Sequence, residues 1–180
     1  MIINERDARH EQVLNIARQM MTAARTAPKG KGVDIIEVAL VTDKDIHRLS
    51  EEMLTIHKEN GFKFFLRDAD NILNAECILL IGTRELAPGL NCGHCGFPTC
   101  TKRPAGVPCA INSVDVGIAI GSACATAADH RVDTRVMFSA GLAAQRLGIL
   151  EGCSQCFAIP VSASSKNPFF DRKPKEQPKE

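Results

Sequence analysis

The stretch Cys77-Ile78-Leu79-Leu80-Ile81 is an unbroken run of five apolar residues. A run of this length, with no polar residue inside it, is typical of a strand that is fully buried. Residues 35–41 and 156–161 are apolar runs of similar length. The sequence therefore predicts three buried strands that are far apart along the chain.

Two amphipathic helices are predicted on either side of the strand at 35–41, because apolar residues recur there at intervals of three and four. The first helix stops near Ala27-Pro28, since proline disfavours helix in the residue before it. The second follows Thr42-Asp43, which can cap a helix. The apolar positions are Val13, Ile16, Ala17, Met20, Met21 and Ala24 in the first helix, and Ile46, Leu49, Met53 and Ile56 in the second.

Three further helices are expected in the rest of the chain. Residues 67–74 form a short one, and residues 112–128 form a small-residue, almost wholly apolar helix that we expect to be buried. Asp133 can cap the last helix, and Gly148 can end it. Its inward positions are predicted to be Val136, Met137, Ala140, Ala143, Ala144 and Leu147.

The order helix, strand, helix, helix, strand, loop, helix, helix, strand predicts an α+β fold with three layers. A chain of 180 residues is long enough for one domain with a substantial core. We assign residues 1–165 to that single domain. Residues 166–180 are charged and contain proline, which predicts a flexible C-terminal tail.

Composition excludes several classes of function. The formal net charge is +1 and the chain has neither Trp nor Tyr, which argues against nucleic-acid binding. The first twelve residues contain no apolar core of a signal peptide, and residues 114–128 are too short and too rich in Gly and Ala to span a bilayer. We therefore expect a cytoplasmic protein, whose eight cysteines are metal ligands or redox groups rather than disulfides.

Residues 82–110 form a loop with no hydrophobic periodicity, so something other than a core must organise it. The loop contains Cys92, Cys95, Cys100 and Cys109 in the pattern C-x2-C-x4-C-x8-C. Four thiolates, one for each iron, are what a 4Fe–4S cluster requires. Gly93 and Gly96 allow the backbone to wrap tightly and to direct N–H groups at the sulfurs. Nearby positive charge comes from Lys102 and Arg103.

Zinc is the alternative ligand of these cysteines. A zinc site usually combines two C-x2-C pairs, and Cys92/Cys95 together with Cys153/Cys156 would supply them. The remaining cysteines also leave two readings open. Cys77, Cys124, Cys153 and Cys156 either form a second metal or redox site or are buried small residues. His94 is expected at the surface or as a hydrogen-bond donor rather than as a ligand.

The string Cys92-Gly93-His94-Cys95-Gly96-Phe97-Pro98-Thr99-Cys100 resembles the 4Fe–4S domain of the Rnf electron-transport complex and of corrinoid iron–sulfur proteins. The shared pattern is C-G-x-C-G-x-P-x-C, and the resemblance implies a 4Fe–4S cluster on the loop. In that domain the fourth ligand lies further downstream than Cys109 does here. Cys124 is therefore an alternative fourth ligand.

Two other stretches resemble flavin-dependent nitroreductases. Residues 23–28 with 36–43 are similar to that family's first helix, A-P-S turn and next strand, and residues 139–149 are similar to a later helix. The resemblance implies a nitroreductase-like α+β fold, a homodimer, and FMN at the dimer interface. Arg25, Lys29 and Lys31 would then hold the flavin phosphate through charge. The alternative is that these three residues are only a solvated basic surface.

Over nearly its full length the chain is identified as a member of the bacterial and archaeal family of uncharacterised ferredoxin-domain-containing proteins. Besides the cysteine loop, residues 132–137 and 166–172 carry this resemblance. The first hypothesis is a 4Fe–4S protein that transfers electrons to a partner protein or a flavin. The alternatives are a structural zinc protein and an FMN-dependent oxidoreductase, so whether the protein is itself an enzyme stays open.

Overall fold

The computed structural model describes residues 1–170. Its centre is one antiparallel sheet with the strand order β1-β2-β4-β3. The strands are β1 (Ile36–Val41), β2 (Cys77–Arg84), β3 (Asp133–Thr134) and β4 (Cys153–Ser162). The three predicted strands are confirmed, and β3 is an additional short edge strand that the sequence pattern did not reveal.

Strand β2 lies between β1 and β4 and is buried on both faces, as its unbroken apolar run predicts. Because side chains alternate along a strand, Ile78 and Leu80 face one side of the sheet, while Leu79 and Ile81 face the other. Each pair belongs to a separate hydrophobic core. The sheet therefore divides the interior into two cores that meet only through its backbone.

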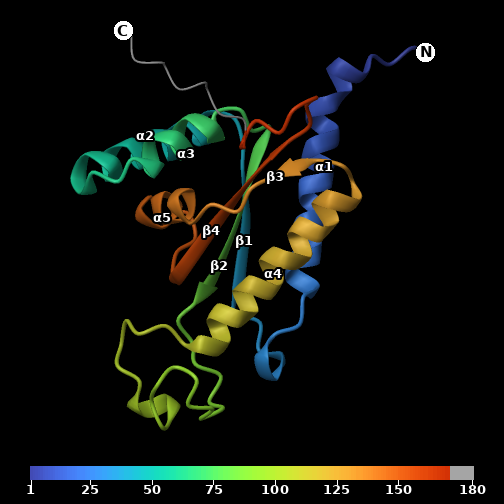
Figure 1. Cartoon of the computed structure of the whole chain (residues 1–180). Coiled ribbons are helices and arrows are strands. Elements are labelled where there is room, and N and C mark those ends of the chain that lie inside the picture. Colours follow the sequence, from blue (N-terminus) through green and yellow to red (C-terminus); the bar gives the residue numbers. More distant parts are fainter. Residues whose placement is uncertain (171–180) are drawn as a thin grey trace, which may run out of the picture.

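Helices cover both faces of the sheet, so the predicted three-layer α+β architecture is confirmed (Figure 1). The long helices α1 (Glu5–Thr26) and α4 (Ala110–Asp129) pack together over one face. On the other face lie α2 (Lys44–Asn60), α3 (Phe64–Ile72) and α5 (Phe138–Arg146). Helix α5 approaches β4 closely, because a Cβ atom on Gly141 would lie 2.0 Å from the carbonyl oxygen of Cys156.

The two amphipathic helices form as the sequence predicts. In α1 the Asn4 side chain accepts a hydrogen bond from the Arg6 N–H, and the helix ends two residues before Pro28. Five of its six predicted inward residues are buried, and the sixth, Met21, is half-buried against the same core. All four predicted inward residues of α2 are buried.

Two predicted helix starts are wrong, whereas α2 begins directly after Asp43, as predicted. Asp43 is the N-cap residue of α2, with φ of 52° and ψ of −128°, but its side chain makes no capping hydrogen bond. Helix α3 begins at Phe64, three residues before the predicted start. Asp133 lies in β3 and pairs with Ser162 of β4 instead of capping a helix. Helix α5 therefore begins only at Phe138, and Val136 is exposed.

Helix α4 is less buried than expected. Asn112, Asp115, Val116, Ala119, Ala123 and Ala127 face the interior, whereas Val114 and Ile118 are 54% and 40% exposed. The helix has 20 residues, longer than the stretch 114–128 that appeared too short for a bilayer. By length and composition alone it could cross a membrane; in this fold it packs on α1 and the sheet.

The C-terminal segment up to residue 170 is packed, which corrects the predicted start of the tail at residue 166. Phe169 is fully buried in the core beneath α2 and α3. Its carbonyl oxygen accepts hydrogen bonds from Asn71 at 3.1 Å and Arg135 at 2.8 Å. Asp68, also buried, accepts a hydrogen bond of 2.6 Å from Ser139. The rest of the predicted tail, 171–180, lies outside the described residues.

We predict that Phe169→Ala lowers the free energy of unfolding by about 3–5 kcal/mol, because it empties a ring-sized volume in the core. Phe170→Ala is the matched control: Phe170 is 60% exposed, and the Arg135 guanidinium lies over its ring, 5.0 Å from the ring centroid. That change should cost no more than about 1 kcal/mol. Urea unfolding followed by circular dichroism measures both, and equal losses would contradict the burial of Phe169.

Candidate metal centre in the cysteine loop

The cysteine loop, residues 85–109, joins the end of β2 to the start of α4 and projects beyond one end of the sheet (Figure 1). No residue from 85 to 108 is buried, and neither hydrophobic core includes any of them. Only Cys109, at the N-cap of α4, is buried. The prediction that this loop is not organised by a core is confirmed for residues 85–108. The predicted loop began at residue 82, which is wrong, because Gly82 and Thr83 are buried in β2.

The loop backbone turns at residues in the left-handed region. Asn91 has φ of 49°, Gly93 of 73° and Gly96 of 86°, and the Gly96 N–H donates to the Gly93 carbonyl at 2.9 Å. The conformational role predicted for both glycines is thereby confirmed. His94 is exposed, and its Nδ1 lies 3.1 Å from the Cys92 carbonyl oxygen. The chain therefore folds back on itself around the first two cysteines.

Asn91 connects the first and third cysteines of the loop. Its side-chain oxygen accepts a hydrogen bond of 2.8 Å from the Cys100 N–H. In return, the Asn91 N–H lies 3.4 Å from the Cys100 sulfur. Sequence reasoning did not single out Asn91, although an asparagine directly before Cys92 is a residue type that tolerates this left-handed conformation.

Arg103 holds the second half of the loop. Its side chain is 9% exposed and its guanidinium pairs with Glu85 at 3.1 Å and with the Val107 carbonyl. Glu85 also accepts a hydrogen bond from the Gly106 N–H at 3.1 Å. These contacts hold the pKa of Glu85 below its usual value, chiefly through the Arg103 hydrogen bond. The Nε of Arg103 is buried and has no partner within residues 1–170.

The four predicted ligands share the loop but differ in exposure. Cys92 is exposed, Cys95 and Cys100 are half-buried, and Cys109 is buried. Within the described part of the chain, no three or more His, Cys, Asp or Glu side chains form a group that could hold a metal ion. Cys109 is the N-cap residue of α4 and lies at the positive end of the helix dipole.

The other four cysteines are divided between the two cores. Cys77 and Cys124 lie on the α1/α4 side of the sheet, and Cys153 and Cys156 lie on the α2/α3/α5 side. Burial raises the pKa of Cys77 and of Cys156 to about 12, and it also raises the pKa of Cys124 and Cys153. This arrangement favours the reading of all four as core residues, because the sheet separates the two pairs.

The three basic residues assigned to a flavin phosphate are engaged with protein groups. Arg25 donates to Asp34 at 2.8 Å and to the Ile36 carbonyl at 2.5 Å. Lys29, whose side chain is 6% exposed, contacts the carbonyls of Ala24 and Arg25. Lys31 reaches the Pro88 carbonyl at 3.3 Å, which brings this basic segment to the cysteine loop.

Asp115 of α4 holds the segment that contains Lys29 and Lys31 through the backbone of Gly30. Both of its carboxylate oxygens accept the Gly30 N–H, at 2.9 and 3.0 Å. Gly30 must remain without a side chain, since a Cβ atom there would lie 2.5 Å from the Ile111 side chain. Helix α4 thus positions both the basic segment and, through Cys109, the cysteine loop.

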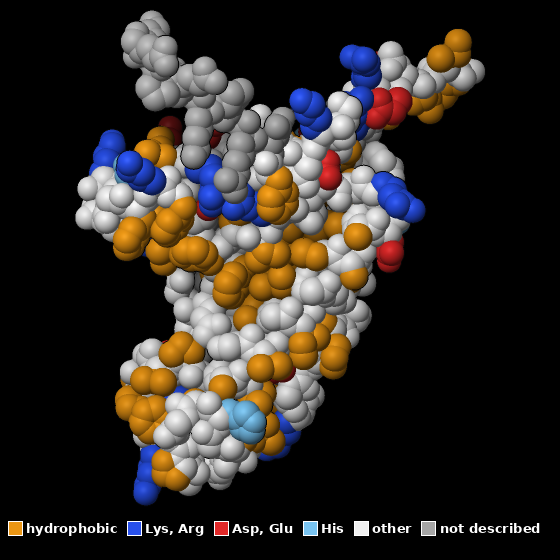
Figure 2. Space-filling view, viewed as in Figure 1, with side chains coloured by type: hydrophobic (Ala, Val, Ile, Leu, Met, Phe, Trp, Pro, Cys, Tyr) orange, Lys and Arg blue, Asp and Glu red, His pale blue; other side chains and the backbone are white. Residues whose placement is uncertain are grey.

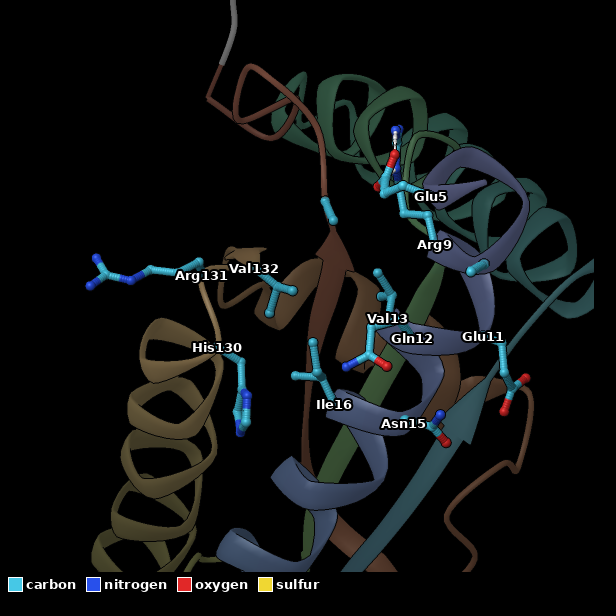
Figure 3. Close-up of a pocket in the computed structure, with 12 residues that line it drawn as sticks. Glu5, Arg9, Glu11, Gln12, Val13, Asn15, Ile16, His130, Arg131 and Val132 are labelled. Atoms are coloured by element: carbon cyan, nitrogen blue, oxygen red, sulfur yellow. Dashed lines mark hydrogen bonds and ion pairs between the residues drawn. The ribbon is translucent and has the colours of Figure 1, made fainter. Parts of the chain in front are cut away.

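A pocket of about 460 Å³ lies at the other end of α4, between that helix and the N-terminal half of α1 (Figure 3). Its floor is apolar, with Val13, Ile16 and Val132, while Gln12 and His130 lie at its sides (Figure 3). It contains none of the residues that the sequence singled out for chemistry. A 20-residue helix is about 30 Å long, so the pocket is remote from the four cysteines of the loop.

Comparison with known proteins shows both the family and the fold. Residues 105–172 match the model of the family described as "Uncharacterized protein containing a ferredoxin domain (DUF2148)", a range that includes Cys109 but not the three cysteines before it. An uncharacterized protein from Archaeoglobus fulgidus is 38% identical over 186 residues, covering 98% of this chain and 100% of the relative.

Solved structures with the same fold include nitroreductases. One with bound FMN from Desulfitobacterium hafniense superposes with a TM-score of 0.61 and 16% identity, covering 99% of this chain and 96% of the other. Another with bound FMN, from Bacteroides fragilis, has a TM-score of 0.58 and 13% identity, covering 84% and 79%. The chain therefore belongs to the family of uncharacterized proteins that contain a ferredoxin domain, and it has a nitroreductase-like fold.

Proposed function

We propose that this protein binds a 4Fe–4S cluster through Cys92, Cys95, Cys100 and Cys109 and transfers electrons. The observation that carries the proposal is the cysteine loop itself. Four cysteines occur within 18 residues of a segment that has its own hydrogen bonds and no share in either core. The ferredoxin-domain family and the C-G-x-C-G-x-P-x-C string support the same conclusion.

The donors and charges of the loop fit a cluster. Four thiolates around a cubane carry net negative charge, which is stabilised by N–H groups and by nearby positive charge. These features come from the Arg103 guanidinium, whose side chain is 9% exposed, from the positive end of α4 at Cys109, and from the Asn91 N–H beside Cys100. When bound, such a cluster accepts or gives up one electron at a time.

The position of the loop suits exchange of electrons with a second molecule. It projects from the end of the sheet, and Cys92 is exposed. Leu86 and Leu90, 56% and 42% exposed, lie on the same loop and offer apolar contact area. We infer that a redox partner protein approaches the loop directly. We keep the expectation of a cytoplasmic protein that does not bind nucleic acid.

FMN is the second candidate electron acceptor. The structural relatives bind FMN, and the Lys31–Pro88 contact places the predicted phosphate-binding segment beside the cysteine loop. A flavin held there would lie close to the cluster. Zinc in a two-pair site is less favoured, because Cys153 and Cys156 are buried in the core under α5, whereas Cys92 is exposed on the loop.

We further propose that the protein is a homodimer in which α4 contacts a second copy. The resemblance to nitroreductases implies a dimer, and α4 presents Val114 and Ile118 to solvent. Figure 2 shows apolar side chains along α4 and in the hollow between α4 and the α2/α3 layer. Val136, Phe138 and Leu142, each 37–56% exposed, extend this apolar surface. A second copy would remove it from water.

The cluster is tested by iron, sulfide and absorbance analysis of protein purified without oxygen. We expect about four irons and four sulfides per chain and an absorbance band typical of iron–thiolate clusters. Cys95→Ser should lose the band and most of the iron, because it removes one of four ligands. Bright yellow protein with extractable FMN would establish the flavin as well.

Cys124→Ser is the matched control, since Cys124 is half-buried outside the loop and would matter only as the alternative fourth ligand. It should keep full iron and sulfide, whereas Cys109→Ser should not. Stoichiometric zinc without sulfide in the wild-type protein would overturn the cluster and leave a metal that only stabilises the loop.

The dimer is tested by Ile118→Glu, which places a charge in the centre of the proposed interface. We expect the wild-type protein to have twice the chain mass by light scattering and the variant to be monomeric. Leu54→Glu on α2 is the control, because Leu54 is 37% exposed, nearly as much as Ile118, but is not one of the residues of the proposed interface. A monomeric wild type, or an Ile118→Glu variant that remains dimeric, would refute this interface.

A further inference from the structure

Asn91 and Cys100 hold each other through two reciprocal contacts. The Cys100 N–H donates to the Asn91 side-chain oxygen at 2.8 Å, and the Asn91 N–H points at the Cys100 sulfur from 3.4 Å. The first distance is that of a normal hydrogen bond, and the second lies within the range for a sulfur acceptor. A single residue thus fixes both the backbone and the side chain of Cys100.

The conformation of Asn91 makes the second contact geometrically available. Its φ of 49° turns the backbone so that its N–H faces back toward residue 100 instead of outward. Asparagine adopts this region at lower cost than most residues with a Cβ atom. Because Asn91 directly precedes Cys92, the same residue sets the spacing between the first and third thiols of the loop.

We propose that Asn91 is a positioning residue for the Cys100 thiolate: its carboxamide fixes the Cys100 backbone and its N–H hydrogen-bonds the ligating sulfur. This inference rests on the proposed 4Fe–4S cluster. A hydrogen bond to a ligating thiolate stabilises the more negative, reduced cluster, so Asn91 should raise the reduction potential. Asn91 itself is not a ligand.

Two substitutions distinguish the contribution of the Asn91 side chain from that of its backbone N–H. Asn91→Gly keeps the N–H and the left-handed backbone but removes the oxygen that fixes Cys100. Asn91→Asp keeps an acceptor oxygen in the same place. Leu90→Ala is the matched control, because Leu90 is the exposed neighbour of Asn91 and its apolar side chain makes no hydrogen bond that the change could remove. None of the three touches a core, so thermal unfolding of the domain should be unchanged.

The measurements are iron and sulfide content and the reduction potential of the reconstituted cluster, determined by redox titration. We expect Asn91→Gly to lose at least half of the cluster, because the Cys100 backbone loses the oxygen that holds it. The remaining potential should shift negative by about 59 mV, a tenfold change for a one-electron couple, because a Cys100 that is no longer held moves its sulfur away from the N–H of residue 91. Asn91→Asp should restore the cluster content, and Leu90→Ala should match the wild type in both measurements.

Three results would overturn the inference, and they can be told apart. If the wild-type protein holds a cluster and Asn91→Gly keeps the same content and potential, Asn91 does not position Cys100. If the wild-type protein assembles no cluster at all, the proposed function fails and this inference falls with it. Loss of cluster in Leu90→Ala as well would show that the loop is merely sensitive to any substitution.

Discussion

The burial of β2 on both faces is the constraint on which the rest of the molecule depends. Its alternating side chains supply the two cores, and each core requires its own layer of helices. Helix α4 must therefore lie against one face, with its first residue near the end of β2. The 25 residues from 85 to 109 therefore begin and end near the same end of the sheet, so they form one compact loop that carries the cysteines.

Much of this architecture could be predicted because it depends on apolar periodicity. The inward faces of α1 and α2 and the three long strands follow from patterns that local sequence expresses fully. Errors arose where tertiary contacts override local preference. Asp133 is a good capping residue in isolation, but pairing with Ser162 in the sheet takes precedence. Likewise, no local pattern shows that Phe169, inside a charged and proline-bearing segment, fills the core.

The candidate site was found from the spacing of its cysteines, whereas its supporting contacts were not. Contacts such as Glu85 with Arg103, or Lys31 with Pro88, join residues 18 and 57 positions apart, and no periodicity encodes them. For helix α4 the sequence predicted too much burial. Its apolar composition predicted burial, but composition cannot tell whether an apolar face meets the same chain or another molecule, and Ile118 remains exposed in the single chain.

No residue between positions 85 and 108 is buried, so the residues that stabilise the fold and the residues of the loop are different sets. Substitutions in the sheet and its helices act on folding, whereas substitutions in the loop act on the proposed metal centre, with little overlap between them. The loop can therefore change in length and surface while the scaffold stays folded. Under the proposed function, the redox properties of the loop could change without a new core being required.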